Sequence, residues 1–246
     1  MTFRGILLAI LTTFMLIGSA SAQTFDGDQK KAIENIVREY LLANPEVLLQ
    51  SVEEYRQRQE MSKQDQVKLK LEKYADVLKF NPGSPVGGNP KGNITVVEFF
   101  DYRCPYCKKV FPTVQKLLKE DKNIRYVLKE FPILGPVSVI ATRVSLALWA
   151  IDPKKYMTYH TSVMTSRGSL DEQRIFKYAK KAGYDVSEVR ARMDDPAIKL
   201  EIAANMKLAE ELGINGTPAF VIGRHVVPGA VDMATLKQLI RATRNN

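Results

Sequence analysis

The two cysteines of this 246-residue chain, Cys104 and Cys107, stand three positions apart. The stretch before them, 94–100, is rich in β-branched and aromatic residues and predicts a buried strand. After them, apolar residues recur at helical spacing over 108–118. A strand that leads through C-x-x-C into the start of a helix is typical of a redox-active pair.

The start of a helix is a special electrostatic environment for the first cysteine. The Sγ of Cys104 would face unpaired backbone N–H groups and the positive end of the helix dipole, and both favour a thiolate. Lys108 and Lys109 add positive charge one turn later. Such settings lower the pKa of cysteine, ordinarily about 8.5, by roughly one to five units. We therefore expect Cys104 to be a solvent-open nucleophile and Cys107 to resolve its mixed disulfides.

Other roles for this pair are less favoured. A structural disulfide would close too small a loop to restrain much of the unfolded chain. A zinc site would need two more ligands, and the sequence has no second C-x-x-C and no H-x-x-x-H. We expect no cofactor, although Cys104 and Cys107 could serve as soft ligands for copper.

Residues 1–22 are typical of a secretory signal peptide, with Arg4 before an apolar run and small residues at 20–22. We therefore expect export to the periplasm, where disulfides persist. The formal charge of +9 could indicate a protein that binds nucleic acid. Because no arginine-rich run or RNA-binding motif accompanies it, we expect unfolded secreted proteins, and not nucleic acid, as partners.

The region before the cysteines predicts helices whose apolar faces need a partner. One face begins at Ile33, and the run 44–46 reads as a helix restart. After a polar gap at 56–66, a second stripe runs from Val67 to Leu78. These stripes could fold back on the rest of the chain or pack against other copies, and the gap favours self-association. The predicted domains are a signal peptide at 1–22, a helical oligomerisation domain at 23–60, a helical linker and turn at 61–92, and a catalytic domain at 93–246.

The predicted catalytic domain has a second informative stretch, Thr217-Pro218, before a short strand. A cis peptide bond there would leave the preceding backbone free to pair with an extended substrate. Glu98 lies among apolar neighbours and would be a buried proton acceptor, unless it reaches water or pairs with Lys129. The other predicted elements are a strand at 124–131, an all-helical insertion at 136–212, strands at 219–222 and 225–227, and a helix at 232–243.

This order of elements resembles the α/β thioredoxin fold in its DsbA-like form, over residues 93–243. The resemblance implies that Cys104 is the nucleophile, Cys107 the resolving thiol and Pro218 a cis proline beside them, with Glu98 as the acidic residue of the first strand. Thr217 before the proline is more similar to isomerases and reductases than to the oxidase.

Residues 33–49 resemble the N-terminal domain of the suppressor-of-copper-sensitivity C (ScsC) proteins, some of which are trimeric disulfide isomerases. The two resemblances together imply a periplasmic protein-disulfide isomerase that assembles as a homotrimer through 23–60 and is reduced by a membrane thiol reductase. The alternatives are a DsbA-like oxidase, re-oxidised by a membrane oxidase, and a copper-binding or copper-tolerance protein. His160 and His225 have no companion at ligand spacing and are expected to be incidental.

Overall fold

The computed structural model describes residues 25–245, so the predicted signal peptide at 1–22 lies outside the described residues. By its contacts the chain divides into two units, Met1–Gln59 and Glu60–Asn246. Within 25–245, no helix combines the length and the apolar character that crossing a membrane requires.

The described part of the first unit is helical. α1, Gly27–Ala43, begins at a capping box in which Asp26 and Gln29 bond each other's backbone N–H groups. α2, Pro45–Lys73, starts two residues after α1 ends, which confirms the predicted restart. Most of the large apolar side chains of α1 and of the first part of α2 are exposed: Ile33, Ile36, Val37, Tyr40, Leu42, Leu48, Leu49, Val52 and Tyr55.

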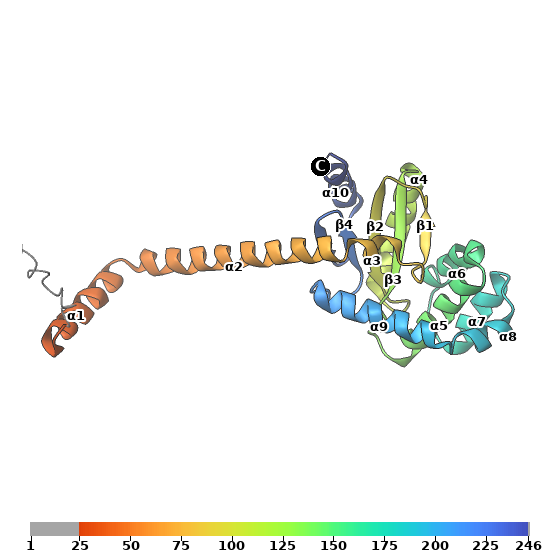
Figure 1. The fold of residues 1–246 in the computed structure, drawn as a ribbon, viewed down its shortest axis with the longest axis horizontal. Helices are drawn as coiled ribbons and strands as arrows, with labels where there is room; N and C mark the ends of the chain where they lie inside the picture. The colour runs from red at the N-terminus through yellow and green to blue at the C-terminus, as the bar shows by residue number, and fades with distance from the viewer. Residues whose placement is uncertain (1–24, 246) are drawn as a thin grey trace, which may run out of the picture. The chain divides into compact units, whose positions relative to one another are not determined.

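The second unit is built on a five-stranded sheet with the order β1-β3-β2-β4-β5 (Figure 1). β2 and β3 are parallel, and the other neighbouring strands are antiparallel. β2 and β4 have the predicted bounds. The strands are β1 Val86–Gly88, β2 Ile94–Phe100, β3 Ile124–Glu130, β4 Ala219–Ile222 and β5 His225–Pro228.

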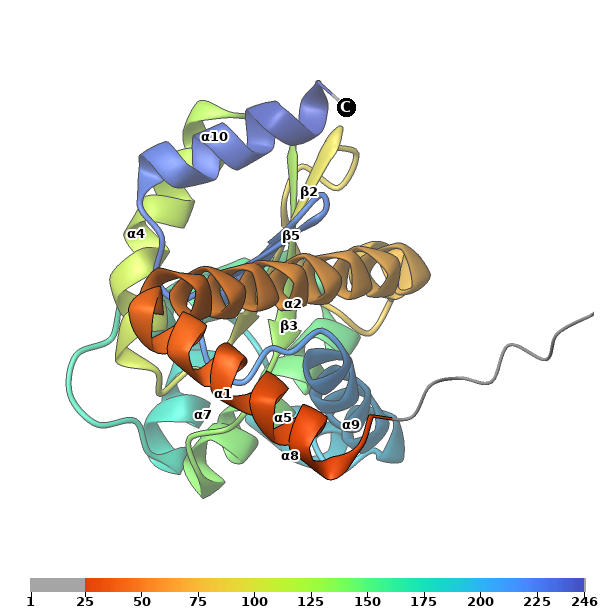
Figure 2. The same cartoon turned by 90° about the vertical axis from the view of Figure 1, so that its left-hand side faces the viewer.

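Helices cover both faces of this sheet, because alternate side chains of the central strands point to opposite sides and all are buried or nearly so. α4, Pro105–Glu120, and α10, Met233–Arg244, pack on one face (Figure 2). The end of α2, the short α3 at Ala75–Phe80 and α9, Pro196–Glu211, pack on the other. The result is the predicted thioredoxin-type α/β fold.

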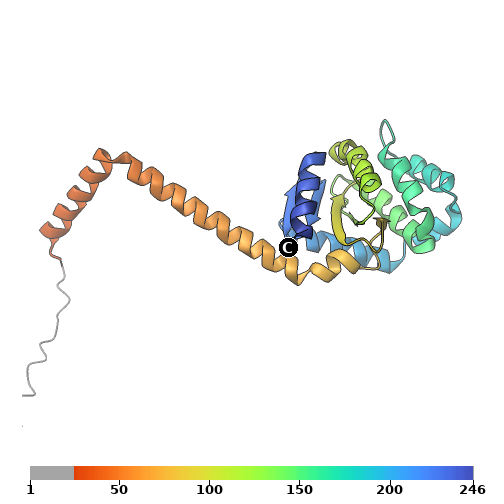
Figure 3. The same ribbon diagram turned by 90° about the horizontal axis from the view of Figure 1, so that it is seen from above.

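Helices fill the predicted insertion at 136–212. Four of them pack against one another (Figure 3), and α9 then returns to the sheet. α5, α6 and α9 each have a proline in their first turn, and an aspartate side chain caps the N-terminus of α6, α7, α8 and α9. The four helices are α5 Pro136–Ile151, α6 Pro153–Met164, α7 Glu172–Lys181 and α8 Val186–Arg192.

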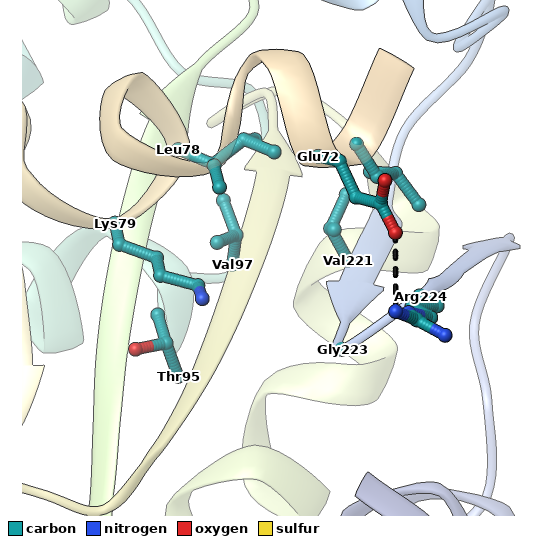
Figure 4. Close-up of a pocket in the computed structure, with 10 residues that line it drawn as sticks. Glu72, Leu78, Lys79, Thr95, Val97, Val221, Gly223 and Arg224 are labelled. Carbon is teal, nitrogen blue, oxygen red and sulfur yellow. Dashed lines mark ion pairs between the residues drawn. The ribbon is translucent and has the colours of Figure 1, made fainter. Parts of the chain in front are cut away.

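The stretch predicted as helical linker and turn, 61–92, contains the end of α2 and α3, and both pack on the sheet. Leu71 and Leu78 are buried in one cluster with Val97 and Val221 of the sheet. Figure 4 shows Leu78 beside Val97. Beside them, Glu72 pairs with Arg224 of the β4–β5 turn at 3.1 Å, at the edge of a cavity of about 200 Å³. The period of the stripe predicts burial of these side chains but not the surface that receives them, and here that surface is the chain's own sheet.

Candidate functional site

Cys104 lies where β2 passes into α4. Its backbone N–H donates to the carbonyl of Asp101 at 3.0 Å, and this turn makes Cys104 the N-cap residue of α4. The backbone N–H of Cys107 in turn donates to the Sγ of Cys104 at 3.4 Å. The sulfur therefore occupies the place that a serine or aspartate oxygen takes at other helix starts.

These contacts change the acidity of the Cys104 thiol. A hydrogen bond from the Cys107 side chain is the main cause that lowers the pKa of Cys104 from its ordinary value to about 6. Hydrogen bonds from Thr217 and from the backbone act in the same direction, and burial opposes them. At neutral pH a thiolate is thus the favoured form.

The surroundings of this sulfur differ from the expectation of an open one. Cys104 keeps only 3% of its surface exposed, and Cys107 none. Both are free cysteines. Burial is the main cause that raises the pKa of Cys107, and the hydrogen bond to Cys104 and the charge of Glu98 raise it further. The two thiols therefore have opposite tendencies to ionise.

The second sequence stretch meets the first one here. The Sγ of Cys104 lies 3.2 Å from the carbonyl oxygen of Thr217, and the Thr217–Pro218 peptide bond is cis. A cavity of about 360 Å³ runs beside this loop, and a second one of about 760 Å³ shares its residues 213–215. The lining is largely apolar and includes Phe131 and Met206, so an extended polypeptide with apolar side chains fits this surface.

Glu98 lies inside the sheet core and is 2% exposed. Burial raises its pKa to about 8, against the lowering effect of a hydrogen bond from the Tyr126 hydroxyl. Lys129, the alternative partner, donates instead to Ser84 at 2.7 Å. Lys129 follows Leu128, the register partner of Glu98, and so points to the opposite face of the sheet.

Asp101 is a buried residue of this site that the sequence reasoning did not single out. Its carboxylate accepts hydrogen bonds from the backbone N–H of Arg103 at 2.7 Å, the hydroxyl of Ser138 at 2.8 Å and the backbone N–H of Leu134 at 3.0 Å. The loop before Cys104 is thereby tied to the loop after β3. Its position three residues before the first cysteine is the one signal the sequence carries.

His160, expected to be incidental, is buried beside the cysteine turn. Its Nδ1 lies 3.0 Å from the hydroxyl of Tyr102, which also contacts Ser145 at 2.9 Å and Tyr156 at 3.3 Å. Burial lowers the pKa of His160 to about 3, so the ring is neutral. His225 is exposed on β5.

The donors around these thiols do not form a metal centre. Across 25–245, no three or more histidine, cysteine, aspartate or glutamate side chains gather in a way that could hold a metal ion.

Comparison with known proteins decides the family. The family described as DSBA-like thioredoxin domain matches residues 95–241, which is more than half of the chain. The chain belongs to this DsbA-like family. The Copper resistance protein ScsC N-terminal domain matches residues 29–61. Both resemblances seen in the sequence are thus confirmed, and with them membership of a family of thiol-disulfide oxidoreductases.

Solved structures agree with the DsbA-like assignment. A thioredoxin-like oxidoreductase from Silicibacter pomeroyi DSS-3 is 40% identical, with a TM-score of 0.67 over 70% of this chain and 98% of that one. A linker-deleted mutant form of Proteus mirabilis ScsC is 28% identical, with a TM-score of 0.69 over 92% of this chain and 99% of that one.

The curated relatives include much longer proteins. The Na(+)/H(+) antiporter NhaA 1 of Salinispora arenicola is 27% identical over 157 residues, 63% of this chain. That match covers only 24% of the antiporter, so this DsbA-like chain spans about a quarter of the length of the first such relatives.

Proposed function

We propose that this protein is a periplasmic protein-disulfide isomerase that acts through Cys104 and Cys107. The observation that carries the proposal is the position of the Cys104 sulfur between two groups. It lies 3.4 Å from the Cys107 backbone N–H and 3.2 Å from the Thr217 carbonyl oxygen. The N–H stabilises the thiolate, while the carbonyl accepts from Cys104 in its thiol form and sets the sulfur beside a backbone and a groove that suit an extended client.

The chemistry of exchange follows from the two thiols. The Cys104 thiolate attacks one sulfur of a client disulfide, so that a Cys104–client bond forms and the other client sulfur leaves as a thiolate. A second client thiolate can then attack, which restores the Cys104 thiolate and leaves the client with a different disulfide. Alternatively Cys107 attacks the Cys104 sulfur, and the client leaves reduced while the enzyme is oxidised.

Isomerisation further requires that the enzyme hold a client with several disulfides. The exposed apolar residues of α1 and of the start of α2, among them Val37 and Leu49, support assembly of copies through 23–60. We infer a homotrimer, as the sequence resemblance implies. Several active sites around one client would raise the effective concentration of thiolate. A membrane thiol reductase would return the pair to the reduced form.

Light scattering and the refolding of a scrambled disulfide protein test this together. The double variant Val37→Asp, Leu49→Asp is expected to be monomeric and to lose about tenfold or more in isomerisation, while its reaction with a small disulfide is unchanged. Leu200→Asp is the matched control, because Leu200 is 70% exposed in the second unit. An assembled double variant, or a monomer that isomerises as well as the parent, would overturn the proposed assembly.

A DsbA-like oxidase is the second candidate, favoured by the family of residues 95–241. An oxidase would donate a Cys104–Cys107 disulfide to reduced clients. The reduction potential separates the two candidates, because an isomerase must remain reduced where it works while an oxidase must be strongly oxidising.

Copper binding is the third candidate and rests on the name of the N-terminal domain at 29–61. Titration with Cu(I) of the parent and of Cys104→Ser would test it. Equal binding by the two proteins would exclude the dithiol as the copper site.

A further inference from the structure

Tyr126 on β3 makes a buried contact with Glu98 of β2. In the parallel register Val96 stands opposite Tyr126, and Glu98 is two residues further along the same face. The Tyr126 hydroxyl donates to Oε2 of Glu98. Tyr126 is 1% exposed and Glu98 2%, so this hydrogen bond is shielded from water.

The groups that face this pair come from several elements. At the start of α4, the charge of the N-cap residue Cys104 raises the pKa of Glu98, and the charge of Cys107 raises the pKa of Tyr126. From α6, the charge of Tyr156 also raises the pKa of Tyr126. From β4, the register neighbour of Glu98 is the apolar Phe220. Among residues 25–245 no cation forms a salt bridge with Glu98: the Tyr126 hydroxyl is the group that bonds its carboxylate.

We propose that Tyr126 is a positioning residue that acts through Glu98, holding its carboxylate in one orientation and stabilising its charged form for the step in which Cys107 reacts. This proposal rests on the proposed thiol–disulfide exchange. A hydroxyl is a neutral donor, so it stabilises the carboxylate less than a lysine or arginine would. The carboxyl group can therefore gain and lose a proton near neutral pH.

The step it serves has a balanced course. The Glu98 carboxylate takes the proton of the Cys107 thiol, and the resulting thiolate attacks Cys104 in the mixed disulfide. The Cys104–client bond breaks, the Cys104–Cys107 bond forms, and the client sulfur leaves with the electron pair and takes a proton from water. Glu98 then returns its proton to solvent. The client disulfide has been reduced and the enzyme dithiol oxidised.

The energetics agree with this arrangement. Burial raises the pKa of Glu98, and the Tyr126 hydrogen bond is the largest effect in the opposite direction. The charge of Glu98 in turn raises the pKa of Cys107. Loss of the hydroxyl should therefore raise the pKa of Glu98 further. The carboxyl group would then be protonated at neutral pH and could not accept the proton of Cys107.

Stopped-flow reaction with an aromatic disulfide that releases a coloured thiol tests the proposal on the full chain. The first release reports attack by Cys104 and the second reports attack by Cys107. In Tyr126→Phe the pH midpoint of the second release is expected to rise by about one unit, with a rate about tenfold lower at neutral pH, while the first release is unchanged. In Glu98→Gln the second release is slow at every pH, and adding Tyr126→Phe to it changes nothing more.

Two further proteins make the test specific. Tyr159→Phe is the matched control, because Tyr159 is buried and its hydroxyl has no hydrogen-bond partner among the described residues; its pH profile should equal that of the parent. Fluorotyrosine at position 126, a stronger donor of nearly the same shape, should lower the midpoint. The fluorotyrosine protein also tests the proposal if Tyr126→Phe does not fold.

The possible failures are distinguishable. A second release whose midpoint is the same in the parent, Tyr126→Phe and the fluorotyrosine protein would overturn the role of Tyr126, and so would a Tyr126→Phe effect that persists in Glu98→Gln. Absence of the first release in the parent would instead overturn the proposed function.

Discussion

The Sγ of Cys104 lies 3.2 Å from the carbonyl oxygen of Thr217, a residue 113 positions later in the chain. This contact joins the two sequence stretches on which the proposed exchange chemistry depends. It places the proposed nucleophile beside the backbone that would pair with a client.

The acidity of Cys104 depends first on Cys107. Alkylation of the parent with iodoacetamide should show a midpoint near pH 6 for Cys104. In Cys107→Ala the midpoint should rise, because that variant removes the largest cause of the lowered pKa. Cys104→Ala is the control, and its remaining thiol should stay unreactive through neutral pH. A midpoint near pH 9 in the parent would contradict this account.

Because Cys104 is proposed to attack first and Cys107 second, their alanine variants should react differently with client disulfides. Cys104→Ala should abolish reaction with client disulfides, because the raised pKa of Cys107 keeps that thiol protonated and it cannot replace Cys104. Cys107→Ala should accumulate mixed disulfides, since the resolving thiol is gone. Non-reducing electrophoresis followed by mass spectrometry would identify the bonded residue, and an adduct on Cys107 in the first variant would show that the roles are reversed.

Asp101 should matter for both stability and reactivity. Asp101→Ala leaves three donors without their acceptor, the buried Ser138 hydroxyl and two part-buried backbone N–H groups, and is expected to lower the free energy of unfolding by about 3 kcal/mol. It should also slow attack by Cys104, because the turn that positions the sulfur is loosened. Ser138→Ala removes only one of these donors and should cost about 1 kcal/mol. Urea denaturation and the rate of alkylation measure the two effects, and equal costs for both variants would contradict this role.

The end of α2 should behave as core. Leu71→Ala is expected to lower the free energy of unfolding by about 2–4 kcal/mol, because Leu71 is 4% exposed. Leu69→Ala, on the same helix but 66% exposed, should change it by no more than about 0.5 kcal/mol. If denaturation gave the two variants the same midpoint, Leu71 would not be packed on the sheet.

Glu130 should make stability fall as pH rises. Burial raises its pKa from 4.5 to about 8, so its contribution is full below pH 4.5 and is lost as pH rises toward 8. The parent should therefore be less stable at pH 8 than at pH 5, by on the order of a few kcal/mol from this group. Glu130→Gln should reduce that difference, whereas the exposed Glu210→Gln should leave it unchanged. A difference as large in Glu130→Gln as in the parent would remove Glu130 as its source.

Periodicity predicted most of the elements, because burial of one face leaves a regular trace in the sequence. The strand at 94–100 and the helical insertion are examples. β1 was not predicted, since two of its three residues are glycines and carry no side chain to show the pattern. The stripe from Val67 to Leu78 showed that a surface must cover it, but not that this surface was the sheet.

The candidate site was predictable where its residues stand in short motifs. The C-x-x-C pair and Thr217-Pro218 have local signatures, and the structure brings them together. The contacts of Asp101 with Ser138 and of His160 with Tyr102 depend on side chains that meet only after folding. For the same reason the near-complete burial of Cys104 has no signature in the chain.

β1 has a consequence for any attempt to isolate the catalytic part. It pairs with β3 on the side that β2 leaves free, and the N–H of Leu128 donates to the carbonyl of Pro85 at 2.9 Å. A fragment that starts at residue 93 would therefore expose an uncovered strand edge, which invites sheet-to-sheet aggregation. A fragment cut at Glu60 would keep that edge closed.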